Sequence, residues 1–344
     1  MDEMAQLNLL RAEVPEPDLP GLRAEEERLM AAIAEPTGSG PARRTSRRRV
    51  FVRVGVAGGL AAAAVAAAVA VSLDSGPRPA LPAPPPSAVA PVAVIRTLDH
   101  AAEAALRRPE PHPRPGQFLV VRSRSLEEVD SDSARYLSDT RRTVWLPVAG
   151  DATGGVIEEQ VLAPKAYPGW PIPPEARTEQ GAHGPDRLAD FDGRAEYLRN
   201  DYAYLSRLPT DTAGMRRHLY VGAKRGAEGD RDAWQRVGGM LTEAYLPAAQ
   251  RAALFRAAAT IPGAEAVASA QDAAGRAGVA VAMTDPEAGT RQEYIFDRHT
   301  YLYLGARTVI VDPAKARGTK GGVTESTAQL SVRVSDTAPR IKKN

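Results

Sequence analysis

The sequence predicts an α+β fold in which an antiparallel sheet of sequential hairpins packs on helices. One transmembrane helix and a short helical or disordered tail precede this domain. Two observations support the prediction. Residues 54–73 form an uncharged run directly after a cluster of arginines. Farther along the chain, after Pro262-Gly263, the apolar spacing changes from a helical period of about 3.6 to a strand period of about 2.

The uncharged run 54–73 has the length of a membrane-spanning helix, because about 20 apolar residues cross the hydrocarbon core. Arginines cluster on its N-terminal side, and they are Arg43, Arg44, Arg47, Arg48, Arg49 and Arg53. This bias predicts a cytoplasmic N-terminus and an extracytoplasmic domain after Leu73. The predicted localisation is therefore the cell membrane, crossed once, with the lipid bilayer as the first partner.

A cleaved export signal is the alternative interpretation of the same run. Ala68-Val69-Ala70 has the small residues of a cleavage site, and residues 48–53 approximate a twin-arginine signal. Secretory signals place an apolar region of about 7–15 residues behind a short basic segment, whereas about 50 residues come first here. The length therefore favours a retained anchor.

Composition limits the function classes. The chain has 344 residues, 43% hydrophobic and 25% charged, with a net charge of +2, so no bulk charge favours nucleic acid as a partner. It contains no cysteine, which excludes disulfides, thiol nucleophiles and thiolate zinc sites. The predicted organisation is an acidic cytoplasmic tail at 1–42, a basic juxtamembrane segment at 43–53, the transmembrane helix at 54–73, a proline-rich linker at 74–91, an extracytoplasmic α+β domain at 92–335 and a frayed tail at 336–344.

The first half of the outer domain predicts one helix and three strands. The helix covers 94–106 and ends before Pro109, and strands are expected at 117–125, 141–148 and 155–162. The proline-rich residues 163–190 predict a long loop or a covering flap. Thr210 or Asp211 is expected to cap a helix that continues to Leu219.

The second half predicts a helical hairpin and then a meander of strands. Trp234, Val237, Leu241 and Tyr245 repeat at helical spacing, and Pro247 can open the next helix. Strands are predicted at 264–270, 278–284, 290–297, 301–311 and 328–334, joined by polar turns at 272–275, 286–289 and 297–300. Short turns join antiparallel neighbours. Each helix has one apolar stripe and each strand alternates, so these elements are expected to bury their apolar faces against one another.

Several stretches resemble an actinobacterial family of uncharacterised single-pass membrane proteins known by a locus-tag name. The most specific are Phe255 to Gly263, and Tyr294-Ile295-Phe296-Asp297 through Leu304-Gly305. The acidic helical tail at 9–34, the basic block and span, residues 208–211 and the whole of 251–311 also match. Many family members accompany extracytoplasmic-function sigma factors, so the resemblance implies a sigma factor as a cytoplasmic partner of the tail. The tail lacks the His-x-x-x-Cys-x-x-Cys module common in anti-sigma domains.

The helix pair followed by antiparallel hairpins resembles, more distantly, the lipoprotein-carrier (LolA-like) fold. In that fold a curved, half-barrel sheet wraps around helices, and periplasmic regulators of envelope-stress anti-sigma factors share it. The resemblance implies a half-barrel-like sheet here. It implies little about function, since one fold hosts many functions.

Motifs for catalysis and metal binding are missing from the sequence. The five histidines, His100, His112, His183, His218 and His299, are not at metal-ligand spacing. The sequence has no Gly-x-Ser-x-Gly elbow, no Ser-x-x-Lys and no phosphate loop. Glu158 and Glu159 would point to opposite faces of a strand. We therefore expect no enzyme activity, no cofactor and no metal.

Aromatic side chains give the remaining candidates for a site. Trp234, Phe255, Tyr294, Phe296 and Tyr301 lie on the predicted helices and strands. They predict either a core or an apolar cleft suited to an acyl chain or an apolar peptide. The leading hypothesis is a membrane-tethered protein that binds or senses an envelope ligand and signals through its tail. An anchored carrier or scaffold for lipid or lipoprotein is the second, and a cell-wall hydrolase is the third.

Overall fold

The computed structural model describes residues 91–131, 134–150, 154–188 and 195–341, which belong to one compact unit. Within these residues, none of the helices has both the length and the apolar character needed to cross a membrane. The predicted tail, the orienting arginines and the predicted span at 54–73 lie outside the described residues.

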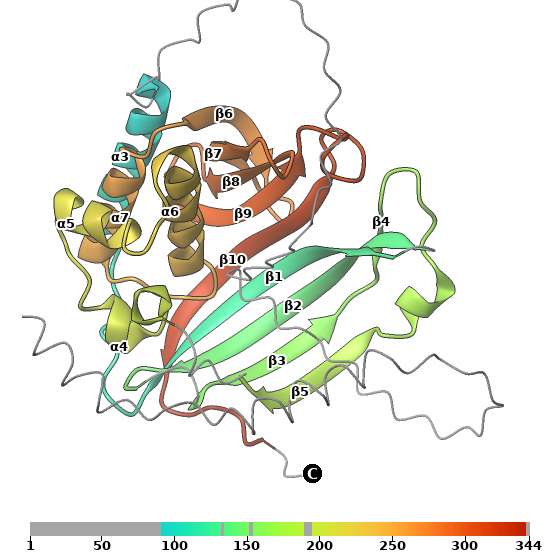
Figure 1. The fold of residues 1–344 in the computed structure, drawn as a ribbon. Helices are drawn as coiled ribbons and strands as arrows, with labels where there is room; N and C mark the ends of the chain where they lie inside the picture. Colours follow the sequence, from blue (N-terminus) through green and yellow to red (C-terminus); the bar gives the residue numbers. More distant parts are fainter. Residues whose placement is uncertain (1–90, 132–133, 151–153, 189–194, 342–344) are drawn as a thin grey trace, which may run out of the picture. The chain divides into compact units, whose positions relative to one another are not determined.

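In the described part of the chain, ten strands form one sheet, and every pairing is antiparallel (Figure 1). The strands are β1 (Phe118–Asp130), β2 (Arg135–Pro147), β3 (Val156–Val161), β4 (Lys165–Ala166), β5 (Gly181–Arg187), β6 (Ala264–Gln271), β7 (Ala277–Asp285), β8 (Thr290–Phe296), β9 (Tyr303–Ile310) and β10 (Val323–Ser335). Their order is β5-β3-β2-β1-β10-β9-β8-β7-β6, and β4 pairs with β2. The α+β class and the antiparallel hairpins are confirmed.

The described helices are α3 (Val92–Arg107), α4 (Tyr202–Leu205), α5 (Thr212–Leu219), α6 (Gly226–Leu241) and α7 (Ala248–Ala258). Asp211 caps α5, as expected, because its carboxylate accepts a hydrogen bond of 2.7 Å from the amide of Gly214. Pro247 lies at the N-cap of α7, one residue earlier than the first-turn position predicted for it. α7 ends at Ala258, before Ile261, which was expected to belong to it.

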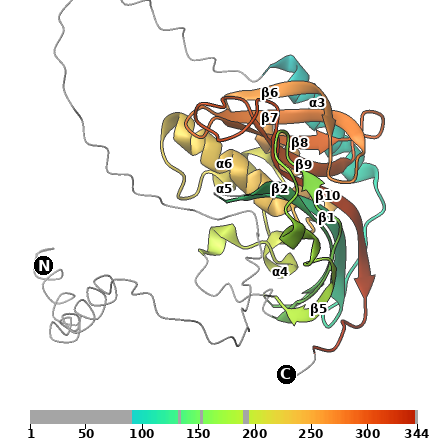
Figure 2. The same cartoon turned by 90° about the vertical axis from the view of Figure 1, so that its right-hand side faces the viewer.

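The C-terminal meander matches its prediction within a few residues, and the succession of β6, β7, β8, β9 and β10 is visible in Figure 2. β9 begins two residues later than expected. Tyr301 has a φ of 55°, and the carboxylate of Asp297 accepts hydrogen bonds from the amides of His299 and Thr300. This side-chain turn keeps Tyr301 out of the extended conformation that a strand needs.

Strand β10 is longer than the segment predicted at 328–334, and it joins the two parts of the sheet. It pairs with β9 on one side and with β1 on the other. The strands β1, β2, β3 and β5 are here called the N-terminal half, and β6 to β9 the C-terminal half. The pairing of β10 with β1 has no local sequence signal, because the two strands are about 200 residues apart in the chain.

Residues 163–190, predicted as a loop or flap, contain β4, a short 3₁₀ helix (Pro174–Arg177) and β5. β5 is an edge strand that pairs with β3, and its side chains are half-buried or exposed. An edge strand with no buried face shows no apolar alternation, which explains why the pattern failed to predict it. Ala338 and Ile341, from the predicted frayed tail, pack against Val120 and Trp145.

The main core lies between helices α3, α5, α6 and α7 and the C-terminal half. Trp234 of α6 stacks on Tyr294 of β8 with ring centroids 4.8 Å apart, and Phe255 of α7 meets Phe296 edge to face at 5.4 Å. All four rings are almost completely buried. Burial of these rings, together with the aliphatic side chains around them, stabilises the domain.

Candidate ligand cleft

A cleft of about 250 Å³ opens beside this core, between the end of α3, the connection between α6 and α7, and strands β9 and β10. Its lining combines polar and apolar side chains, and the apolar ones are Ala101 and Ala105 from α3, Met240 and Leu241 from α6, Phe255 from α7, Tyr303 and Leu304 from β9, and Leu330 and Val332 from β10. Leu330 is 40% exposed, which is unusual for a large aliphatic side chain on a central strand. The cleft therefore offers apolar surface that the protein's own core leaves uncovered.

One wall of the cleft is held by Glu110, which follows α3. Its carboxylate accepts a hydrogen bond of 3.0 Å from the Tyr245 hydroxyl and another from the amide of Ala248, the first residue of α7. A carboxylate at a helix N-terminus is stabilised by the free amides and by the helix dipole. Burial, together with the neighbouring Glu110, raises the pKa of Tyr245 to about 12, so this hydroxyl remains a donor at neutral pH.

Arg251 of α7 places a half-buried guanidinium beside that wall. Its Nη2 donates to the carbonyl of Leu246 over 2.7 Å, and its guanidinium carbon lies 5.1 Å from the centre of the Tyr245 ring. Burial lowers the pKa of Arg251, but an arginine keeps its charge at neutral pH. The connection between α6 and α7 is thus fixed by Glu110 on one side and by Arg251 on the other.

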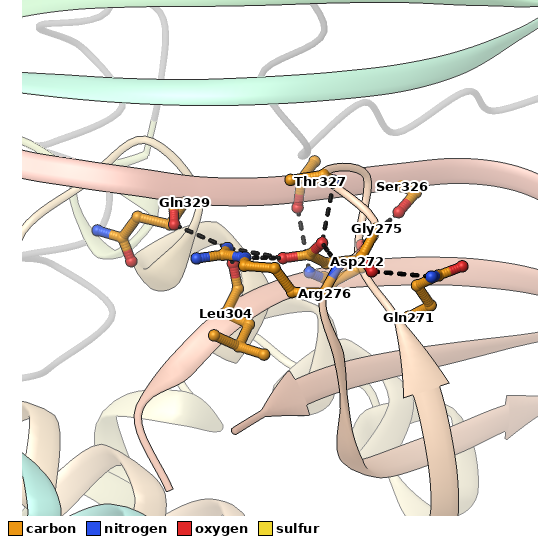
Figure 3. A network of polar contacts seen from close by, with 10 residues as sticks. Gln271, Asp272, Gly275, Arg276, Leu304, Ser326, Thr327 and Gln329 are labelled. Atoms are coloured by element: carbon orange, nitrogen blue, oxygen red, sulfur yellow. Dashed lines mark hydrogen bonds and ion pairs between the residues drawn. The ribbon is translucent and has the colours of Figure 1, made fainter. Parts of the chain in front are cut away.

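Arg276 closes another side of the cleft and joins the turn between β6 and β7 to strands β9 and β10 (Figure 3). Its Nε donates to Asp272 over 2.7 Å, and its Nη2 donates to the carbonyls of Leu304 and Gln329 over 2.8 and 2.9 Å. Asp272 is buried and also accepts from the amides of Ala274 and Arg276. The network holds the turn between β6 and β7 against β9 and β10, so the wall they form is rigid.

Two non-glycine residues with left-handed backbone lie at the border of the cleft, Tyr301 with a φ of 55° and Glu243 with a φ of 49°. Strained residues of this kind concentrate at ligand sites and switch regions. The Tyr301 ring lies 4.7 Å from the His100 ring, and a shallower hollow with His299, Arg107 and Arg108 on its rim adjoins the cleft there. The basic side chains gather at this end.

The structure separates the predicted aromatic candidates into two groups. Trp234, Tyr294 and Phe296 lie in the core, where the Tyr294 hydroxyl donates to the Trp234 carbonyl over 2.6 Å and accepts from the Gly238 amide over 2.9 Å. Phe255 and Tyr301 line the cleft. Phe255 does both, since one side of its ring contacts the core.

A second polar group lies on the inner face of the N-terminal half, the face that contacts the connection between α6 and α7. Arg142 of β2 is 6% exposed, and its Nε is 3.1 Å from Glu159 of β3, while its Nη1 is 3.3 Å from Glu243. The Ser123 hydroxyl donates to Glu243 over 2.7 Å. Glu243 thereby ties the connection that lines the cleft to the N-terminal half.

Sequence reasoning did not find Glu110, Glu243, Arg251 or Arg276. Glu110 and Ala248 are 138 positions apart, and Ser123 and Glu243 are 120 apart, so no local pattern contains either contact. The turn from Asp272 to Arg276 did have a local signal, because an aspartate at a turn commonly accepts from amides just after it. Among the described residues, no group of three or more histidine, aspartate or glutamate side chains is arranged to hold a metal ion.

No family model and no curated relative matches the chain. Among solved structures, it is similar to a chain in the complex of MucA and MucB from Pseudomonas aeruginosa, at 13% sequence identity and a TM-score of 0.22. The match covers 72% of this chain and 58% of that chain, so it spans less than two thirds of that chain's length. A TM-score this low establishes neither a shared fold nor a shared function.

Proposed function

We propose that the protein is a membrane-tethered, non-enzymatic binding and sensing protein whose outer domain takes an apolar ligand with an acidic end. The observation that carries the proposal is the cleft of about 250 Å³, where aliphatic and aromatic walls meet three arginines and one carboxylate. The arginines are Arg108, Arg251 and Arg276, and the carboxylate is Glu110. Asp272 neutralises Arg276 and Glu110 contributes one negative charge, so with Arg108 and Arg251 the cleft keeps a net positive charge.

The size and the walls favour one apolar chain or side chain over a bulky ligand. Ligand pockets commonly measure about 300–1,000 Å³, and this cleft lies just below that range. Arg108 is exposed at the end of α3, where an acidic head group could reach it from solvent. A guanidinium recognises carboxylate, sulfonate and phosphate groups alike through paired hydrogen bonds.

The membrane anchor and the cytoplasmic partner of the tail are proposed from the N-terminal sequence. The arginine cluster before the uncharged run at 54–73 supports a cytoplasmic tail and an outer domain. Reporter fusions at Gly40 and Ala90 should be active in the cytoplasm and outside it, respectively. A mature protein that begins near Val71 would establish cleavage and remove the anchor.

A sigma factor is the proposed partner of residues 1–45, and capture of a sigma factor by this segment tests it.

An anchored carrier is the second candidate function, and the exposed Leu330 at the cleft favours it. A carrier would release its ligand to an acceptor, whereas a sensor would change what its tail binds. Ligand-dependent binding of a partner by residues 1–45 would support sensing. Transfer of the ligand with no effect on the tail would support the carrier.

The cleft is tested with two amphiphiles of equal chain length and opposite fixed charge. The full-length chain should bind decanesulfonate and should bind decyltrimethylammonium much more weakly. Arg108→Glu should weaken decanesulfonate binding about tenfold or more, because it reverses a charge at the cleft. Arg96→Glu is the matched control, since Arg96 is exposed on the same helix and does not line the cleft. Equal binding of the two amphiphiles, or equal effects of the two substitutions, would overturn the proposal.

A further inference from the structure

The seam where β1 pairs with β10 brings two carboxylates directly opposite each other. Glu127 of β1 and Glu325 of β10 are partners in the register of this antiparallel pair. Both are half-buried. Like charges at directly opposite positions of neighbouring strands destabilise the pairing. This seam is the connection between the N-terminal half of the sheet and β10, which continues into the C-terminal half.

The groups around the seam leave it with too little positive charge. The charged or titratable side chains that face it are Glu127 from β1, Arg142 from β2, Glu159 from β3, Tyr294 from β8, Tyr303 from β9, Glu325 from β10 and Glu243 from the connection between α6 and α7. Among them are four carboxylates and one guanidinium. Arg142 directly contacts Glu159 and Glu243, so Glu127 and Glu325 have no cation of their own in this group.

The surroundings of the two opposed carboxylates favour their neutral forms. Burial raises the pKa of Glu127, and although Arg142 opposes this, Glu243 and Glu159 raise it further. Burial also raises the pKa of Glu325, and the neighbouring Glu127 adds to the effect. Acidification therefore protonates these two side chains before an ordinary glutamate.

We propose that the seam between β1 and β10 is a proton-sensitive latch, which tightens when Glu127 and Glu325 become neutral. Protonation removes the repulsion across the strand pair and leaves Arg142 shared by Glu159 and Glu243. The stabilisation is fully present below the ordinary pKa of glutamate, and it is lost as the pH rises through the raised pKa values in the folded protein. The latch therefore strengthens in the pH range where most carboxylates are still ionised.

The latch regulates the cleft, and this part of the inference rests on the proposed function. β10 contributes Gln329, Leu330 and Val332 to the cleft, only a few residues beyond Glu325. Glu243 holds the connection whose next residues, Ala244 and Tyr245, also line it. A firmer seam pre-organises both walls, and pre-organisation raises affinity. Neutral carboxylates near the cleft also favour an anionic ligand.

The test compares unfolding of the full-length chain at about pH 5.5 and about pH 7.5. On acidification, the melting temperature of the wild type should rise more than that of the double variant Glu127→Gln with Glu325→Gln. The difference between the two changes should be on the order of 2–4 °C. Each single variant should remove part of this difference. Glu158→Gln is the matched control, because Glu158 is on the same sheet, one position from Glu159, and outside the group. Identical pH dependence of the wild type and the double variant would overturn the latch.

Binding of decanesulfonate gives a separate readout, since the charge of this probe is constant over the range. In the wild type its affinity should rise a few-fold on acidification, and in the double variant this rise should disappear. If decanesulfonate fails to bind at either pH, the proposed function fails, whereas the melting curves still decide the latch. If binding rises equally in both proteins, the latch does not regulate the cleft and the inference is overturned.

Discussion

The two halves of the sheet cover their inner faces in different ways. Helices α3, α5, α6 and α7 lie on the C-terminal half and bury a large core with Trp234, Phe255 and Phe296 at its centre. The N-terminal half has a smaller apolar cluster around Leu119 and Val144, which Tyr245 partly closes, and its remaining inner face is charged. One half thus supplies stability and the other supplies titratable contacts. The cleft lies where β10 joins them.

The largest expected effect is loss of the aromatic core of the C-terminal half. Phe296 is fully buried and contacts Phe255 and Tyr303 edge to face, so Phe296→Ala should lower the free energy of unfolding by about 3–5 kcal/mol. Urea unfolding of the full-length chain measures this. Phe255→Ala should cost a similar amount. If Phe255→Ala left stability intact and abolished binding of decanesulfonate, Phe255 would serve the cleft alone, which would favour the carrier function.

In the N-terminal half, the largest effect should come from the charged group. Arg142→Met leaves Glu159 and Glu243 without their cation in a largely buried position. The substitution should lower the free energy of unfolding by about 2–3 kcal/mol. This is less than the cost of breaking a fully buried ion pair, because both carboxylates keep some contact with water. Arg141→Met is the control, since Arg141 is exposed on the opposite face of β2. A difference between the two variants below about 0.5 kcal/mol would show that the ion pairs do not hold the connection between α6 and α7 against the N-terminal half.

A smaller effect tests how the strands and helices of the C-terminal half are joined. Tyr294→Phe removes a hydroxyl that bonds the Trp234 carbonyl and the Gly238 amide, so it should cost about 1–3 kcal/mol while the ring packing stays. Gly238 matters for the same reason, because a Cβ there would approach the Tyr294 hydroxyl to 2.8 Å. Equal stability of Tyr294→Phe and the wild type in urea would contradict this account of the contact.

The smallest effect is expected at the turn between β8 and β9. His299 is exposed, and its backbone amide, which a substitution retains, makes the hydrogen bond to Asp297. His299→Ala should change the free energy of unfolding by no more than about 0.5 kcal/mol. A loss comparable to that of Tyr294→Phe would mean that the imidazole itself makes a structural contact.

The sequence was most informative where structure depends on neighbours in the chain. Asp211 caps α5 as expected, and alternation with polar turns located β6 to β9. It failed at β5, whose half-buried and exposed residues show no alternation, and at the pairing of β10 with β1.

The cleft could be predicted only in part. Phe255 and Tyr301 were candidates for it, but Trp234, Tyr294 and Phe296 had the same apolar pattern and lie in the core. Whether an aromatic ring faces a core or a cleft depends on what covers it. Here this is decided by Glu110 and Glu243, whose contacts join segments more than 100 residues apart. Such contacts form only when the whole sheet is assembled, so no window of the sequence contains them.

The central claim is that a ligand binds at the border between the C-terminal half, which the helices cover, and the N-terminal half, which carries the charged group around Arg142. Hydrogen exchange of the full-length chain, with and without decanesulfonate, tests it most directly. The amides of β7 and β8 should exchange slowest in both states, because they lie under the helical core. Decanesulfonate should slow exchange at 242–247 and 329–332 and leave β7 and β8 unchanged. Slowing confined to β7 and β8, or none at 242–247 and 329–332 when the probe is bound, would contradict the claim.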